Sequence, residues 1–197
     1  MCCSEPPKHE PFPEGKWVEV MNTVKECGMI EAECIMCSSK HTILNYFCQR
    51  DTPLNVVEEI YTVNPDSVFE KDCQDRYPLH IAANNNASAE VIQFLVEQNP
   101  AAVSSKDKEG KYPIHLAFQK FRYQHKDKNS LSMSKRKLKN LSRIIKCLCK
   151  IAPTTINAED NRGRSPIEYA IEKEINIKII RELQVNAAVI NGRKSEQ

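Results

Sequence analysis

The chain has 197 residues, enough for one domain or one repeat array, and a formal net charge of +2. No apolar run approaches the roughly 18 residues of a membrane span, and the N-terminus lacks the apolar core of a secretory signal. Nine cysteines, an odd number, without such a signal indicate reduced thiols. We therefore expect a cytoplasmic protein without a disulfide framework, with entry into the nucleus as the alternative.

Two segments are predicted to precede the regular part of the chain. Residues 1–15 are rich in proline and glutamate and are predicted to be disordered. Residues 16–35 are predicted to form an N-terminal capping helix, because Trp17, Val20 and Val24 recur at the spacing of one helix face. A repeat array needs such a cap at its open end.

Three cysteines and a histidine near this region have the residue types of a zinc site. Cys34 and Cys37 form a Cys-x2-Cys pair, Cys27 precedes them and His41 follows. Three sulfurs and one nitrogen suit tetrahedral zinc. The spacing from Cys27 is loose, however, and the pair also fits core packing and a turn. We therefore expect no metal and no other cofactor.

A sequence motif that begins with aspartate, here called the phrase, recurs along the chain at a fixed distance. Three copies start at Asp72, Asp107 and Asp160 and read DCQDRYPLHIA, DKEGKYPIHLA and DNRGRSPIEYA. The prolines of the first two copies, Pro78 and Pro113, lie 35 residues apart. A period of about 20 to 50 residues is typical of stacked repeats rather than of one globular core.

Pairs of apolar residues repeat with the same period. Val91-Ile92 and Ile179-Ile180 each follow the proline of their unit at the same distance. In the third unit the matching pair, Ile144-Ile145, comes later than this distance requires. The third unit is therefore predicted to contain an insertion between its two helices.

A weaker copy of the phrase marks a first unit. Residues 41–47 keep its apolar character without the proline, and Val56-Val57 follow at the expected distance. Four units are therefore predicted. The predicted organisation is a disordered segment at 1–15, a capping helix at 16–35, an array at 36–185 and a tail at 186–197.

Each unit is predicted to contain two helices and a link. The proline of the phrase suits the first turn of a helix, where its missing N–H has no partner to lose. Ala89 to Gln98 has apolar residues on one helix face, and Asn99-Pro100 ends this second helix, because a residue before proline avoids the helical region. The link at 101–106 carries no helix pattern and is predicted to be extended.

The phrase resembles the ankyrin signature T-P-L-H-x-A. Residues 77–82 and 112–117 match five of its six positions, and residues 165–170 replace the histidine with glutamate. This resemblance implies an all-α repeat solenoid of ankyrin-type helix-turn-helix units joined by β-hairpin-like links. The period of this chain is longer than the roughly 33 residues of the ankyrin family, and the tetratricopeptide repeat, with roughly 34, is the rival interpretation.

The resemblance also implies a structural role for two histidines. His80 and His115 are expected to hydrogen-bond backbone groups and fasten one hairpin to the next, and Asn45 and Glu168 to take over this role in the other units. No hydrolase, phosphate-loop or metalloprotease motif occurs in the chain. We therefore do not expect an enzyme.

Basic residues are concentrated in the third unit. Residues 119–150 contain eleven lysines and arginines against one aspartate, a net charge of +10, whereas the rest of the chain carries −8. The insertion, at about 119–139, is predicted to be a mobile loop around the serine-rich stretch 126–135. Its predicted binding residues are Lys126, Lys128, Lys135, Arg136, Lys137 and Lys139.

A second group of cations recurs two residues before the proline of each unit. Arg76, Lys111 and Arg164 occupy this position, and His41 occupies it in the first unit. The resemblance places it at the hairpin tip that ankyrin proteins use for contacts, and stacked units lie roughly 10 Å apart. With the neighbouring tip residues, the predicted partner-binding set is His41, Gln74, Arg76, Lys108, Lys111, Arg162 and Arg164.

These patterns lead to two functional expectations. The first is a non-catalytic scaffold or adaptor subunit that binds an acidic surface of another protein through the hairpin tips and concave helix faces. The alternative is that the basic insertion binds nucleic acid or an anionic membrane surface, with a steep dependence on salt. Residues 134–139 also resemble a nuclear-import patch, a common pattern.

Overall fold

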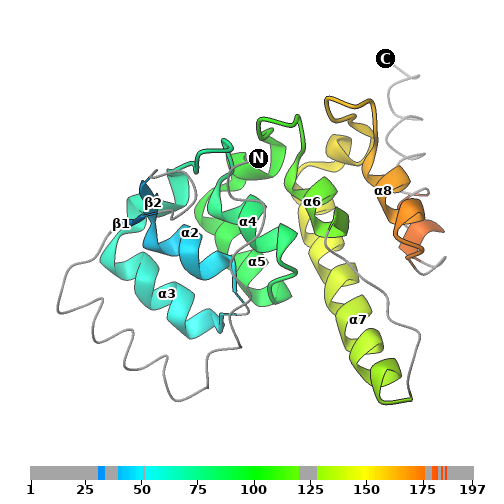
Figure 1. The fold of residues 1–197 in the computed structure, drawn as a ribbon, viewed down its shortest axis with the longest axis horizontal. Helices are drawn as coiled ribbons and strands as arrows, with labels where there is room; N and C mark the ends of the chain where they lie inside the picture. The colour runs from blue at the N-terminus through cyan, green and yellow to red at the C-terminus, as the bar shows by residue number, and fades with distance from the viewer. Residues whose placement is uncertain are drawn as a thin grey trace.

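The computed structural model describes residues 31–33, 40–50, 52–119, 128–175, 179–181, 183 and 185. Two short antiparallel strands precede a row of helices (Figure 1). The elements in chain order are β1 (Glu31–Glu33), β2 (Lys40–Thr42), α2 (Ile43–Cys48), α3 (Leu54–Val63), η1 (Pro65–Phe69), α4 (Pro78–Asn84), α5 (Ala89–Gln98), η2 (Pro100–Ser104), α6 (Pro113–Gln119), α7 (Lys128–Ile151), η3 (Pro153–Asn157) and α8 (Pro166–Glu172).

The helices form two layers, and each of the first three units contributes one helix to each layer. Helices α2, α4, α6 and α8 pack on one another in chain order, and α3, α5 and α7 form the second layer beside them (Figure 1). The apolar pairs Val56-Val57, Val91-Ile92 and Ile144-Ile145 are buried in the core between the layers. The predicted all-α repeat solenoid is confirmed.

The first helix of each unit begins where the sequence predicts it. Pro78, Pro113 and Pro166 are the first residues of α4, α6 and α8. The first unit has no proline there, but Thr42 replaces its effect, since its Oγ1 accepts a hydrogen bond from Asn45 N at 3.2 Å and caps α2. The weaker first copy of the phrase therefore keeps its helix.

The links differ from the predicted extended chain. Each starts with a 3₁₀ helix, η1, η2 or η3, whose first residue is the in-register proline Pro65, Pro100 or Pro153. Proline suits this position because its fixed φ matches the turn and it has no N–H to leave unpaired. Such a helix spans five residues here, too few for a periodic pattern to reveal it.

The basic insertion also differs from its prediction. From residue 128 onward the predicted mobile loop is the start of α7, a helix of 24 residues that continues into the second helix of the third unit. Neither glycine nor proline interrupts residues 128–151, and lysine, arginine and leucine favour helices. The loop prediction was wrong because it relied on polarity and serine content alone.

Several predicted segments lie outside the described residues. These are the disordered segment 1–15, the tail 186–197 and most of the capping helix at 16–35. The described end of that helix, residues 31–33, instead forms strand β1, in which Ala32 pairs with His41 of β2. The helix prediction fails at these residues because pairing with β2 overrides a pattern read from one segment.

Candidate protein interaction surface

Each described hairpin tip is built around one buried aspartate, Asp72, Asp107 or Asp160. In all three, Oδ1 accepts hydrogen bonds from the backbone N–H groups two and four residues further on, at 2.8 to 3.0 Å. The backbone N–H of the same aspartate donates to the carbonyl four residues on, at 2.9 to 3.0 Å. A buried carboxylate needs such donors, so the aspartate fixes the shape of the tip.

One residue of each tip has a left-handed backbone. Gly110 and Gly163 have φ of 77° and 72°, and Asp75 occupies the same place with φ of 59°. Glycine adopts this conformation freely, whereas a side chain strains it. At Gly110 a Cβ would also lie 2.2 Å from Asn161 Oδ1, so the next tip leaves no room for a side chain.

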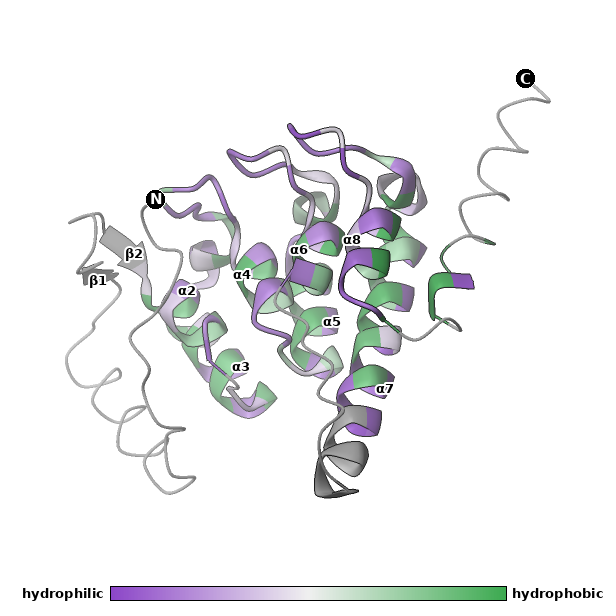
Figure 2. Ribbon diagram, turned by 45° about the vertical axis from the view of Figure 1, so that its right-hand side comes forward, coloured by the Kyte–Doolittle hydropathy of each residue, from purple (hydrophilic) through white to green (hydrophobic). Residues whose placement is uncertain are grey.

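Hydrogen bonds join the three tips into one row, which we call the tip row (residues 72–76, 107–111 and 160–164). Lys108 N donates to Gln74 O, and Asn161 N donates to Glu109 O, each at 3.0 Å. The Lys108 ammonium donates to Cys73 O at 2.7 Å. Figure 2 shows the row as hydrophilic loops along one edge of the array. A partner would therefore meet one continuous surface rather than separate loops.

The two repeat histidines fasten the units as expected. His80 Nδ1 accepts from Tyr77 N at 3.3 Å, so its Nε2 carries the proton and donates to Ser105 O in the next link at 3.0 Å. His115 accepts from Tyr112 N at 3.2 Å and donates to Ala158 O at 3.0 Å. Burial disfavours the charged form and lowers the pKa of both histidines to about 4. Both are structural and neutral at pH 7.

The substitutes in the outer units behave differently from the prediction. Within the described residues, the Asn45 side-chain amide is buried without a hydrogen-bond partner, so it makes none of the bonds there that the histidine makes in the next units. Its side chain is shorter than an imidazole. Glu168 takes over half of the role: its Oε2 accepts from Ser165 N at 2.6 Å, as the histidine Nδ1 does, within its own unit. The two histidines thus hold the middle of the array.

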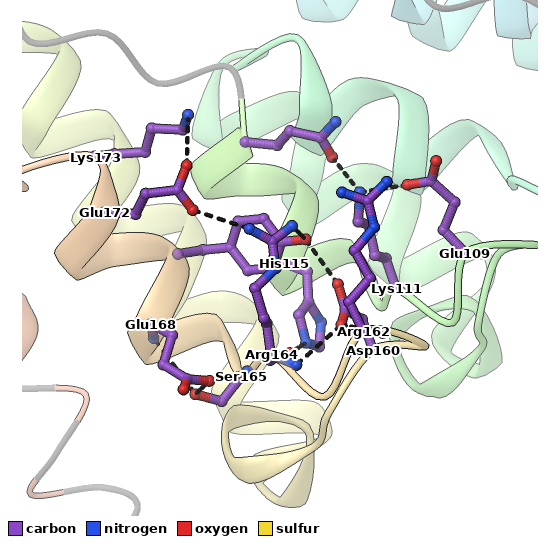
Figure 3. A network of polar contacts seen from close by, with 12 residues as sticks. Glu109, Lys111, His115, Asp160, Arg162, Arg164, Ser165, Glu168, Glu172 and Lys173 are labelled. Atoms are coloured by element: carbon purple, nitrogen blue, oxygen red, sulfur yellow. Dashed lines mark hydrogen bonds and ion pairs between the residues drawn. The ribbon is translucent and has the colours of Figure 1, made fainter. Parts of the chain in front are cut away.

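The cations that recur two residues before each proline form bonds with other residues of the same chain. Arg76 Nε donates to Asp72 Oδ2 at 2.8 Å, and Arg164 forms an ion pair with Glu172 at 3.0 Å. The Lys111 side chain is 4% exposed, and its ammonium pairs with Glu109 and donates to the Gln119 amide oxygen at 3.1 Å (Figure 3). Burial excludes Lys111 from direct partner contact. For Arg76 and Arg164, which are partly exposed, binding stays a prediction.

Asp160 has one side-chain partner, a tyrosine, that the other two tip aspartates lack among the described residues (Figure 3). The Tyr169 hydroxyl donates to Asp160 Oδ2 at 2.7 Å, and the Arg164 guanidinium lies over the Tyr169 ring, 4.2 Å from its centroid. Burial opposes ionisation of Asp160, but hydrogen bonds from Tyr169 and from the backbone N–H groups of Arg164 and Arg162 lower its pKa. Burial, together with the bond to Asp160, raises the pKa of Tyr169. The contacts of Asp160 and Arg164 with Tyr169 thereby hold the last described tip against α8.

The other predicted tip residues present more of their surface. Lys108 and Arg162 are exposed, and Gln74 is half-buried. His41 lies in β2, and its side chain is outside the described part of the structure. Partner binding by these residues stays a prediction.

Two exposed lysines next to the tip row escaped the prediction. Lys71 Nζ lies 4.9 Å from the centroid of the Tyr77 ring, and Lys106 Nζ lies 5.3 Å from that of Tyr112. Both lysines directly precede the tip aspartate, and both tyrosines directly precede the proline. The lysine and the tyrosine therefore recur together in two units of the sequence, and this pattern could have predicted the two lysines.

The basic residues of the predicted insertion lie on α7 where they are described. Lys135, Arg136, Lys137 and Lys139 are exposed on this helix. Lys128 belongs to its first turn, with its side chain not described, and Lys126 lies outside the described residues. The zinc candidates Cys27, Cys34 and Cys37 are also outside, and the part of the chain that is described holds no cluster of metal-ligating side chains.

Comparison with known proteins agrees with this architecture. Within the described ranges, no helix is both long and apolar enough to cross a membrane. Residues 44–127 match the family model for ankyrin repeats, in three copies. No curated protein matches the chain. Ankyrin repeats are generally non-catalytic modules for protein–protein interaction. Residues 44–127 are thus similar to ankyrin repeats, and the stacked helix pairs and the hydrogen-bonded tips agree with this similarity.

Proposed function

We propose that this protein is a non-catalytic scaffold or adaptor subunit that binds an acidic surface of another protein through the tip row and the adjoining faces of the first helices. The tips are held by buried aspartates and by one another. A surface fixed before binding loses little conformational entropy when a partner docks, which favours affinity.

The observation that carries this proposal is the pair of lysines fixed on tyrosine rings. Lys71 and Lys106 are exposed and occupy equivalent positions in successive units, above Tyr77 and Tyr112. A cation–π contact limits the freedom of a lysine side chain without neutralising its charge. Two ammonium groups held one repeat apart favour a partner whose carboxylates have a similar separation.

The tip row as a whole is not strongly basic. Asp75, Glu109 and Glu159 are exposed beside the lysines and balance part of their charge. Recognition at the tips therefore depends on where charges lie rather than on net charge. A partner that matches this pattern is favoured over a uniformly acidic chain, because misplaced carboxylates would face Asp75 or Glu109.

Charge reversal tests this proposal without disturbing the core. Partners captured from cell extract by the intact protein are compared by mass spectrometry with those captured by Lys71→Glu and Lys106→Glu variants. The main partner is the protein captured in the largest amount by the intact chain, and both variants are expected to lose it. Arg181→Glu, at an exposed helical position that is not part of the tip row, is the matched control and is expected to retain it. Retention of that partner by both tip variants, with unchanged circular dichroism, would contradict the proposal.

A further inference from the structure

A groove of about 350 Å³ lies between α7 and the turn that joins α4 to α5. Four cations of α7 line it, namely Arg136, Lys137, Lys139 and Arg143, and Glu90 at the start of α5 is the one carboxylate among its described lining residues. Arg143 forms an ion pair with Glu90 at 2.6 Å. The remaining three cations are exposed, and no ion pair joins them to another residue in the described part of the chain. Among its described lining residues, the groove therefore carries a net positive charge.

The two walls of the groove are held together by Asn140. Its Nδ2 donates to Ala87 O at 2.9 Å, and its Oδ1 accepts from Ala89 N at 2.8 Å. The same side chain thus joins α7 to the turn and caps an N–H group at the start of α5. The cations are consequently carried on a fixed wall rather than on a mobile loop.

We propose that this groove binds an extended, acidic segment of a partner protein, whose carboxylates pair with Arg136, Lys137 and Lys139. The inference rests on the proposed function as a protein-binding module and adds a second surface, on the outer helix layer. Arg136 and Lys139 are separated by about 4.5 Å along the helix, and Lys139 and Arg143 by about 6 Å. Side chains on one face of an extended peptide repeat about every 6.6 Å, a spacing that long cationic side chains follow easily.

The groove suits a peptide better than DNA. Glu90 is an acceptor at the wall, and a peptide brings backbone N–H donors to it, whereas a DNA backbone brings only acceptors. Residues 128–151 also contain no aromatic side chain on which a base would stack.

A membrane surface is disfavoured for a different reason. A helix that lies on a bilayer inserts its apolar face. The apolar residues of α7, among them Leu141, Ile144 and Leu148, are buried in the array. From residue 135 onward, the side chains that α7 exposes to solvent are charged, apart from Ile151 at its last residue, so this part of the helix has no apolar face to insert.

Fluorescence anisotropy with the full chain and a labelled peptide tests the proposal. In the peptide, glutamate alternates with glycine, and a matched peptide carries glutamine instead. We expect the glutamate peptide to bind at least about tenfold more tightly than the glutamine peptide, since three charge pairs are lost. The double variant Arg136→Glu and Lys139→Glu should bind the glutamate peptide more weakly than the intact protein by a similar factor. Glu90→Gln, which removes the competing carboxylate, should tighten it by about threefold.

Two controls separate this site from the tip row and from other polyanions. Lys71→Glu should leave the peptide affinity unchanged, so failure of the tip proposal and failure of this one give different results. A labelled oligothymidylate and vesicles containing phosphatidylserine are measured in parallel. The proposal is overturned if the glutamate peptide does not bind saturably, or if the groove variant binds it as the intact protein does. It is also overturned if the oligonucleotide or the vesicles bind more tightly than the peptide and lose affinity in that variant.

Discussion

Acidification from pH 7 to pH 5 is expected to destabilise the array through its two buried histidines. His80 and His115 are fully buried and neutral, and their pKa values are lowered from 6.5 to about 4 in the folded chain. In the unfolded chain both regain ordinary pKa values. Between these two limits the unfolded state binds more protons than the folded state, so falling pH favours unfolding.

The magnitude follows from the pKa difference. Stability contributed by each neutral histidine is complete above pH 6.5 and is lost as the pH falls toward 4, by about 1.4 kcal/mol per pH unit. Integrated from pH 7 to pH 5, one histidine reduces the free energy of unfolding by about 1.8 kcal/mol, and the two together by about 3.6 kcal/mol. This is a large part of the total free energy of unfolding of a typical folded domain, which is only on the order of 10 kcal/mol.

Urea denaturation at pH 7 and pH 5, followed by circular dichroism, measures this loss. The control is the double variant His80→Gln and His115→Gln, in which a side-chain amide N–H replaces the imidazole donor and does not titrate. We expect the double variant to be less stable at pH 7 but to lose much less stability on acidification. A loss of equal size in the intact protein and the double variant would refute the reasoning, because the titrating groups would then lie elsewhere.

Three further substitutions test the tips and the groove by the same urea denaturation assay. Gly110→Ala should lower the free energy of unfolding by more than about 1 kcal/mol, because alanine strains the left-handed backbone and meets Asn161; an unchanged midpoint would contradict this. Asp75→Gly should raise stability by about 0.5 kcal/mol, since glycine relieves the same strain one tip earlier, and a loss would argue against it. Asn140→Ala should lower it by about 1 to 3 kcal/mol through the two lost hydrogen bonds, with Ser142→Ala, two residues away on α7, as the tolerated control.

Most of the array could be predicted from the sequence because its markers are local and recur. The prolines at the starts of α4, α6 and α8 and the buried apolar pairs each act within one unit, and the fixed period shows that they belong together. The histidines could be assigned to structure for the same reason. Their recurrence at equivalent places argued against a catalytic role, and the resemblance to ankyrin repeats implied a contact with the next unit, which His80 and His115 both make.

The direction of a side chain could not be predicted in the same way. Lys111 and Lys106 are both lysines near a tip, yet one is buried against Glu109 and the other is exposed on Tyr112. Which of them faces solvent depends on the path of the hairpin, and this path is set by the bonds to Asp107. The helix at residues 128–135 was missed because polarity was given more weight than helix propensity.

The hydrogen bonds between the tips all run in one direction, and this gives the row a polarity. In both junctions the later hairpin donates through the residue after its aspartate, Lys108 or Asn161, and the earlier hairpin accepts two residues after its own. The carbonyl of Arg162 is the equivalent acceptor on the last described tip, and no backbone N–H within the described residues bonds to it. Among the described residues, the row thus ends on an unpaired backbone acceptor, as the open edge of a sheet does. One more hairpin, or an extended strand from a partner, would find there a backbone acceptor already aligned with those that join the earlier units.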